Sequence, residues 1–145
     1  MQANSGSLYT SIQNKVAIIT FGHPAGNSFT SILLERLVQD LNAVSNNPDV
    51  NVVLLKSEGD KTFCAGASFD ELINIDSHES GKAFFSGFAN VINAMRTCSK
   101  LIVGQVQGKA VGGGVGLIAA CDYALATEAA AIKLSEFSIG IGPFV

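Results

Sequence analysis

The residues best suited to chemistry lie in two loops of small residues and in one later carboxylate. The run Gly112-Gly113-Gly114 ends an apolar, strand-like stretch and opens a helix-like one. Glycine adopts backbone conformations that other residues avoid, and the first amides of a helix have no intrahelical partners. Such a junction presents N–H donors and the positive end of a helix dipole to an oxyanion or carbonyl. Tight helix–strand packing needs the same glycines, so this run alone fits packing and ligand binding equally well.

A second loop, Phe63–Ser68 (FCAGAS), also lies between a strand-like run and the start of a helix. In neighbouring strand–helix units, two such loops lie at the same end of a sheet, where α/β folds bind ligands. Two backbone N–H groups from different loops can bind one thioester oxygen while it becomes an enolate oxyanion. The two loops together therefore predict an oxyanion hole.

The elements that must position these loops follow from hydrophobic periodicity. Leu8–Gln13 and Val16–Phe21 predict a hairpin across Asn14-Lys15, and the apolar spacing of Thr30–Ser45 predicts an amphipathic helix capped by Thr30 or Ser31. The alternation that follows predicts an α/β architecture with right-handed crossovers. Its elements are strands at Val50–Lys56 (buried on both faces), Leu101–Gln107, Tyr123–Ala126 and Ala131–Leu134, a loop at Gly59–Ala67, and helices near Ser68–Ile73, Gly81–Cys98 and Gly113–Cys121.

Composition narrows the class of protein. A chain of 145 residues fits one compact domain, and its 48% hydrophobic and 14% charged content indicates that oligomerisation covers part of the surface. A net charge of −3 without a Lys/Arg cluster argues against nucleic acid and anionic membranes as partners. Cys64, Cys98 and Cys121 form no CxxC pair, and neither a signal peptide nor a membrane-length apolar run is visible. We expect a cytoplasmic protein with no metal site.

Three ordered blocks carry a resemblance to a known family. The blocks are Phe63–Ala67 followed by a helix, Gly108–Gly114 followed by Cys121-Asp122, and Ser135-Glu136 leading into Ile139-Gly140. From about Leu8 to Val145 they resemble the crotonase superfamily, the enoyl-CoA hydratase/isomerase family. The resemblance implies a ClpP/crotonase-like ββα spiral core, a homotrimer or hexamer, and an acyl-CoA thioester as substrate with no separate cofactor.

The resemblance also implies roles for individual positions. Ala65 and Gly113 match the two backbone donors of the family's oxyanion hole. Ala67 and Ser68 match the loop that lines the path of the coenzyme, and Ser68 replaces the family's usual aspartate. With Gly112, these two residues are candidate substrate contacts.

The acid–base residues leave the reaction open. Family hydratases carry two glutamates that position and activate the added water; Glu136 matches the second, and Gly116 occupies the position of the first. A lone carboxylate can move a proton between two carbons on one face, which favours a Δ3/Δ2-enoyl-CoA isomerase. The alternatives are an enoyl-CoA hydratase, a naphthoate synthase-like enzyme, and a non-catalytic acyl-CoA-binding or assembly subunit. A protease relative fits less well because no Ser–His pairing is visible.

Other residues are given structural roles. Phe84, Phe85 and Phe88 form a helical stripe expected in the core rather than as a lid over an acyl pocket. His23 and His78 lie in polar segments without a catalytic partner at a recognisable spacing.

The end of the sequence carries a further expectation. Ile139–Val145 is an apolar, glycine-rich loop, and the family's C-terminal helices have no counterpart after it. We expect residues 1–145 to form an N-terminal spiral core domain without the C-terminal helical trimerisation segment.

Overall fold

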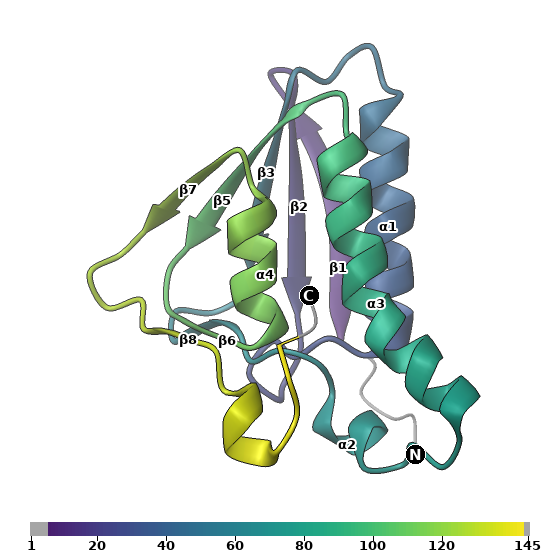
Figure 1. Cartoon of the computed structure of the whole chain (residues 1–145). Helices are drawn as coiled ribbons and strands as arrows, with labels where there is room; N and C mark the ends of the chain where they lie inside the picture. Colours follow the sequence, from purple (N-terminus) through teal and green to yellow (C-terminus); the bar gives the residue numbers. More distant parts are fainter. Residues whose placement is uncertain (1–5, 144–145) are drawn as a thin grey trace.

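The computed structural model describes residues 6–143 and confirms the α/β architecture (Figure 1). The strands are β1 (Ser7–Gln13), β2 (Val16–Gly22), β3 (Val52–Ser57), β4 (Thr62–Cys64), β5 (Leu101–Val106), β6 (Lys109–Val111), β7 (Tyr123–Ala126) and β8 (Ile132–Lys133). The helices are α1 (Ser31–Ser45), α2 (Phe69–Leu72), α3 (His78–Thr97), α4 (Gly113–Ala120) and the 3₁₀ helix η1 (Glu136–Ile139). Within this part of the chain, no helix is both long and apolar enough to cross a membrane.

The larger sheet has five strands in the order β1-β2-β3-β5-β7. β1 and β2 form the expected antiparallel hairpin, and the remaining neighbours are parallel. Asn14 and Lys15 in the turn have φ values of 50° and 66°. Positive φ at both central residues matches the twist of the flanking strands, so the two-residue turn closes the hairpin without splaying them.

A smaller sheet of three strands, β4-β6-β8, was not predicted from the sequence. Its strands have only two or three residues, too few for a periodic pattern, and the sequence suggested a loop over Gly59–Ala67. All its pairings are parallel and join segments far apart, for example Ala110 with Ile132. This sheet matters for function because β4 and β6 end immediately before Ala65 and Gly112.

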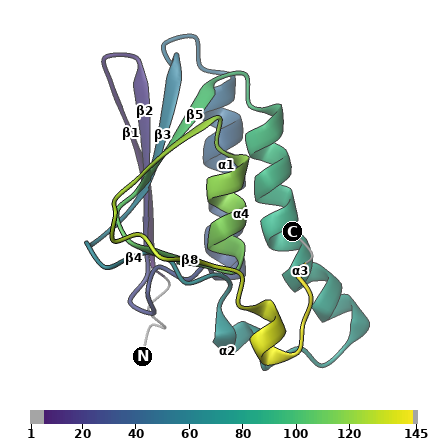
Figure 2. The same ribbon diagram turned by 60° about the vertical axis from the view of Figure 1, so that its left-hand side comes forward.

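Helices α1, α3 and α4 lie on one side of the larger sheet (Figure 2). Burial along β3 alternates accordingly: Val53 and Leu55 are fully buried, whereas Val52 and Leu54 are half-buried. The expectation that this strand is buried on both faces is therefore wrong, because helices cover only one face of the sheet within residues 6–143.

The core between sheet and helices is built on aromatic and leucine packing. The rings of Phe21 and Phe29 are 4.6 Å apart, and those of Phe21 and Phe63 are 5.4 Å apart in an edge-on arrangement. Leu37 and Leu41 of α1 are fully buried. Burying one such side chain stabilises the fold by about 1.5–3 kcal/mol. Helix α1 is consequently anchored firmly to the sheet.

Helix starts are set by hydroxyl caps. Thr30 Oγ1 accepts a hydrogen bond from the N–H of Leu33 (3.3 Å), which identifies Thr30 as the cap of α1. Helix α3 begins at His78, three residues earlier than the sequence suggested, because Ser77 and Ser80 form a reciprocal capping box. His78 is therefore the first residue of a helix and not part of a polar link.

Candidate active site

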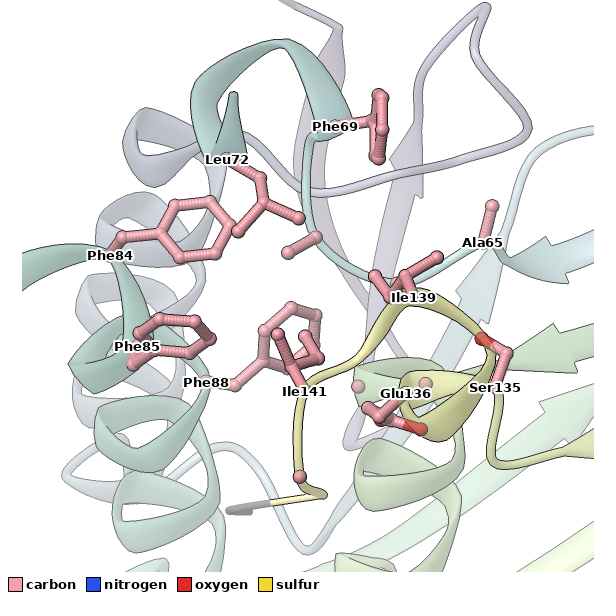
Figure 3. A pocket seen from close by; sticks show the side chains of 15 residues that line it. Ala65, Phe69, Leu72, Phe84, Phe85, Phe88, Ser135, Glu136, Ile139 and Ile141 are labelled. Atoms are coloured by element: carbon pink, nitrogen blue, oxygen red, sulfur yellow. The ribbon is translucent and has the colours of Figure 1, made fainter. Parts of the chain in front are cut away.

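A cavity of about 270 Å³ lies where β4 and β6 end (Figure 3). The two small-residue loops form one side of this cavity. Helices α2 and α3 and the segment around η1 form its other walls. The structure therefore brings the two loops to one site, as the spacing of the motifs predicts.

The triglycine loop supplies an unpartnered donor. Gly112 caps α4 with φ +55° and ψ −125°, a conformation that L side chains rarely adopt, and its N–H donates to the carbonyl of Lys133 (3.0 Å). Gly113 is the first residue of α4, and its N–H has no acceptor among residues 6–143. A free N–H at the start of a helix lies at the positive end of the helix dipole, so it can bind an oxyanion.

Close packing requires the same glycines. A Cβ added at Gly113 would lie 2.6 Å from Cζ of Phe88, and one added at Gly114 would lie 2.8 Å from the carbonyl oxygen of Cys64. Both distances are shorter than any ordinary contact. Packing and an exposed N–H therefore both apply to this loop.

The Phe63–Ser68 loop differs because the amides of Ala65 and Gly66 are already occupied. The N–H of Ala65 donates to the carbonyl of Gly26 (3.0 Å), and the N–H of Gly66 donates to Sγ of Cys64 (3.3 Å). Of the two predicted oxyanion donors, Gly113 is free and Ala65 already has an acceptor. No sequence signal near Ala65 indicates this bond, because Gly26 lies in a distant loop.

Ala67 and Ser68 take different positions. Ala67 lines the cavity, whereas Ser68 is buried, does not line it, and caps α2 by accepting from the N–H of Glu71 (3.3 Å). Phe29 pairs with this stretch: its N–H donates to Gly66 (2.9 Å), and its carbonyl accepts from Ser68 (2.8 Å). Gly112 and Ala67 are thus at the cavity, and Ser68 is not.

Glu136 supplies the carboxylate of the site. It is the first residue of η1 and lines the cavity beside the triglycine loop, where its Oε1 would lie 3.3 Å from a Cβ added at Gly112. Its Oε2 is buried and has no hydrogen-bond partner within the described part of the chain. Leaving a buried carboxylate oxygen unpaired costs free energy, so a proton donor that reached this oxygen would be a favourable partner. Among the described residues that line the cavity, Glu136 is the one charged residue.

The position of the family's first glutamate lies elsewhere. Gly116 is half-buried within α4 and does not line the cavity in the described structure.

Aromatic and aliphatic side chains form the rest of the cavity wall. Phe84 and Phe85 meet edge to face with centroids 5.2 Å apart, and both line the cavity together with buried Phe88 (Figure 3). The expectation that this stripe belongs to the core is therefore correct for Phe88 and wrong for the half-buried Phe84 and Phe85. Sequence reasoning missed Phe69 and Leu72, an i, i+3 pair that directly follows the loop.

Two cysteines with raised pKa values, Cys64 and Cys121, do not line the cavity in the described structure. Burial raises the pKa of Cys64 to about 12, although the hydrogen bond from Gly66 acts in the opposite direction. Burial raises the pKa of Cys121 to about 11, and the neighbouring charge of Asp122 adds to this effect. Both thiols are protonated at neutral pH and are therefore poor nucleophiles.

Comparisons with known proteins place the chain in a family. The family model for enoyl-CoA hydratase/isomerase matches residues 11–145. The short-chain-enoyl-CoA hydratase of Clostridium acetobutylicum is 30% identical over 132 residues, which are 90% of this chain and 50% of that protein. The mitochondrial methylglutaconyl-CoA hydratase of Mus musculus is 32% identical over 117 residues, which are 81% of this chain and 37% of that protein.

A solved structure of an enoyl-CoA hydratase from Bacillus anthracis matches with a TM-score of 0.86 at 28% identity, covering 96% of this chain and 54% of that one. The fold is therefore the crotonase fold. The chain belongs to the enoyl-CoA hydratase/isomerase family. It spans about half the length of the curated relatives that it matches.

Proposed function

We propose that this chain forms the enolate-stabilising site of an acyl-CoA-processing enzyme, with Glu136 as its acid–base group. One observation carries the proposal: Glu136, whose buried Oε2 has no partner within residues 6–143, lines the same cavity as Gly113, whose N–H has no acceptor in that range. Enolate chemistry needs a group that accepts a proton and an N–H group that donates a hydrogen bond to the developing oxyanion. Residues of both kinds line this cavity.

The favoured reaction is a double-bond shift between Δ3- and Δ2-enoyl-CoA. Glu136 takes a proton from C2 of the Δ3-enoyl thioester, and the electron pair moves onto the thioester oxygen to form a dienolate. The N–H of Gly113 stabilises that oxyanion, and Ala65 contributes when its N–H turns from Gly26 to the thioester oxygen. Glu136 then returns the proton to C4, which leaves the Δ2-enoyl thioester. The proton count is unchanged, so one carboxylate suffices.

The cavity wall favours an uncharged, apolar acyl group. Phe84, Phe85, Leu72 and Ile141 line it, and no cationic side chain lines it within residues 6–143. A carboxylate on the acyl chain would lose its hydration here without gaining a partner. An apolar chain instead gains from leaving water.

Hydration of a Δ2-enoyl-CoA is the second candidate. It is favoured by a relative at 30% identity that is named a short-chain-enoyl-CoA hydratase. Against it stands Gly116, which leaves Glu136 to activate the water and protonate the α-carbon alone.

The test is an acyl-CoA panel assayed on the purified chain. Δ3- and Δ2-enoyl thioesters of several chain lengths are followed by ultraviolet absorbance for conjugation and its loss, and binding is measured by calorimetry. Conversion of Δ3 to Δ2 supports the isomerase, and loss of the Δ2 absorbance supports the hydratase. Binding without conversion selects the non-catalytic acyl-CoA-binding subunit. The homotrimer or hexamer and the cytoplasmic location remain predictions.

A further inference from the structure

Helix α2 contributes to the acyl wall but has little packing of its own. It has four residues, Phe69–Leu72, and none of them is buried. Phe69 is 61% exposed, yet it and Leu72 line the cavity, and Leu72 points from α2 toward the cavity centre (Figure 3). A helix this short is not stable in isolation. Its position must therefore be held by contacts from outside the helix.

Glu71 makes that contact. Its two carboxylate oxygens accept from the N–H of Ser31 at 3.1 and 3.0 Å, and its Oε2 also accepts from Oγ of Ser31 at 2.6 Å. The two residues are 40 positions apart in the chain. Hydrogen bonds to an ionised carboxylate are stronger than those between neutral groups. Glu71 therefore ties α2 directly to the start of α1.

Helix α1 is a suitable anchor for this tie. It has no acidic residue in its own first turn, so Glu71 supplies the negative charge that the N-terminal end of its dipole favours. Leu33 and Leu37 of α1 are almost fully buried in the core. The bond thus joins a firmly packed helix to a loosely packed one.

We propose that Glu71 is a positioning residue that holds α2 against α1 and thereby fixes the Phe69 and Leu72 part of the acyl-binding wall. This inference rests on the proposed function, because that function supplies the acyl chain that this wall would bind. Glu71 does not line the cavity, so we expect no direct contact between it and an acyl chain bound there. It acts through Leu72, its neighbour in the chain, and so determines how well longer acyl chains are bound.

The first part of the test measures, without any ligand, whether the hydrogen bonds between Glu71 and Ser31 hold α2 in place. Hydrogen–deuterium exchange is followed in the full chain for the wild type, Glu71→Ala, Glu71→Gln and Asp70→Asn. Asp70 is the matched control, because it is an exposed carboxylate on the same helix whose side chain has no hydrogen bond within the described structure. We expect the amides of α2 and Ser31 to exchange roughly tenfold faster in Glu71→Ala. Glu71→Gln keeps one acceptor oxygen, so its exchange rates should lie between those of the wild type and Glu71→Ala. The exchange rates of Asp70→Asn should match those of the wild type.

The second arm measures affinity against acyl length. Acetyl-CoA does not reach α2, so its dissociation constant stays unchanged in every variant. Octanoyl-CoA reaches the wall, and we expect its affinity to fall roughly tenfold in Glu71→Ala and less in Glu71→Gln, since a tenfold change corresponds to one charge-assisted hydrogen bond. A general folding defect would weaken both ligands alike.

The outcomes separate the two proposals. Unchanged exchange of α2 in Glu71→Ala overturns the tie, whatever the ligands do. Faster exchange with unchanged octanoyl-CoA affinity overturns the positioning role. If the wild type binds neither thioester, the proposed function fails together with the acyl role of Glu71, while the exchange arm still decides whether Glu71 holds α2.

Discussion

The two small-residue loops resemble each other in sequence but differ in hydrogen bonding. In the Phe63–Ser68 loop, the amides of Ala65 and Gly66 donate to Gly26 and to Cys64. In the triglycine loop, the N–H of Gly113 has no acceptor within residues 6–143. The carboxylate of Glu136 lies beside the triglycine loop as well. The two similar motifs thus differ at their predicted donors: the N–H of Ala65 is bonded to Gly26, and the N–H of Gly113 has no acceptor in the described residues.

This difference shows that a small-residue loop can either be fixed by hydrogen bonds of its own amides or leave a backbone N–H open to a ligand. Internal bonds fix the path of the Phe63–Ser68 loop between β4 and α2. The N–H of Gly113 is unpaired because Gly113 begins a helix, and that helix has no carbonyl four positions earlier to accept its hydrogen bond. The loop that opens a longer helix is therefore the better place for an oxyanion donor.

The largest effect is expected at the carboxylate beside the open loop. Glu136→Gln keeps the shape but removes the proton acceptor, so turnover of the preferred enoyl-CoA should fall by about 10²–10⁴-fold. Binding of saturated acyl-CoA should persist, as calorimetry would show. Glu128→Gln, an exposed glutamate that does not line the cavity, is the control. Full turnover by Glu136→Gln would remove the single-base mechanism.

The next effect is expected at the donor itself. Gly113→Ala places a Cβ 2.6 Å from the ring of Phe88, so the ring must move. Overpacking of this kind costs about 1–3 kcal/mol in the free energy of unfolding, measurable by urea denaturation.

Two further variants help to explain any loss of stability in Gly113→Ala. Phe88→Leu in the same chain should recover part of the lost stability. Gly81→Ala is the control for crowding, because Gly81 also lies in a helix without a positive φ, and its added Cβ would meet Ile75 Cγ2 at an ordinary 3.4 Å. If Gly113→Ala is as stable as the wild type, the close packing described for this loop is wrong.

A smaller effect is expected in the internally bonded loop. Gly66 has φ +91°, and an added Cβ would lie 3.2 Å from the carbonyl oxygen of Val111. Gly66→Ala should lower the free energy of unfolding by about 1–2 kcal/mol through backbone strain. We expect its acyl-CoA turnover to fall less than that of Gly113→Ala when both are assayed below their melting temperatures. If turnover falls more in Gly66→Ala than in Gly113→Ala, the proposal that Gly113 is the main oxyanion donor is wrong.

The smallest effect concerns the thiol that accepts a bond within the Phe63–Ser68 loop. The folded pKa of Cys64 is raised to about 12 from 9.0, so the stability that this shift provides is complete below pH 9 and is lost as the pH rises through 12. Between these values the unfolded state binds fewer protons, and the free energy of unfolding falls by up to about 1.4 kcal/mol per pH unit. Denaturation from pH 8 to 10.5 measures this slope, which should be shallower in Cys64→Ser. An identical slope would contradict the burial of this thiol.

Much of the fold follows from local patterns in the sequence. The hairpin at Asn14-Lys15, the helix capped by Thr30 and the helix start at Gly113 occur where periodicity and capping residues predict them. Helix α3 begins earlier than predicted because a Ser77–Ser80 capping box is a weaker signal than one with a glutamate. β4 and β6 were missed because strands this short are defined by their partners rather than by their own composition, whereas β8 lies within the predicted strand Ala131–Leu134.

The candidate site divides in the same way. The motif positions of Ala65, Gly113 and Glu136 were predicted, and the structure gathers all three at one cavity. The sequence did not predict that Ser68 turns away to cap α2, nor that Phe84 faces the cavity. Each of these outcomes depends on a contact with a residue that lies elsewhere in the chain.

By itself, the sequence determined the α/β class, the order of most elements, the family and the motif that contains Glu136. Those properties depend on spacing and on residue type within a few neighbouring positions. The tertiary structure alone decided that the Ala65 N–H is taken by Gly26, that the Gly113 N–H has no acceptor within residues 6–143, and that Glu71 is bonded to Ser31. A donor is free or occupied according to which distant group the fold brings within about 3 Å of it, and no local pattern records that distance.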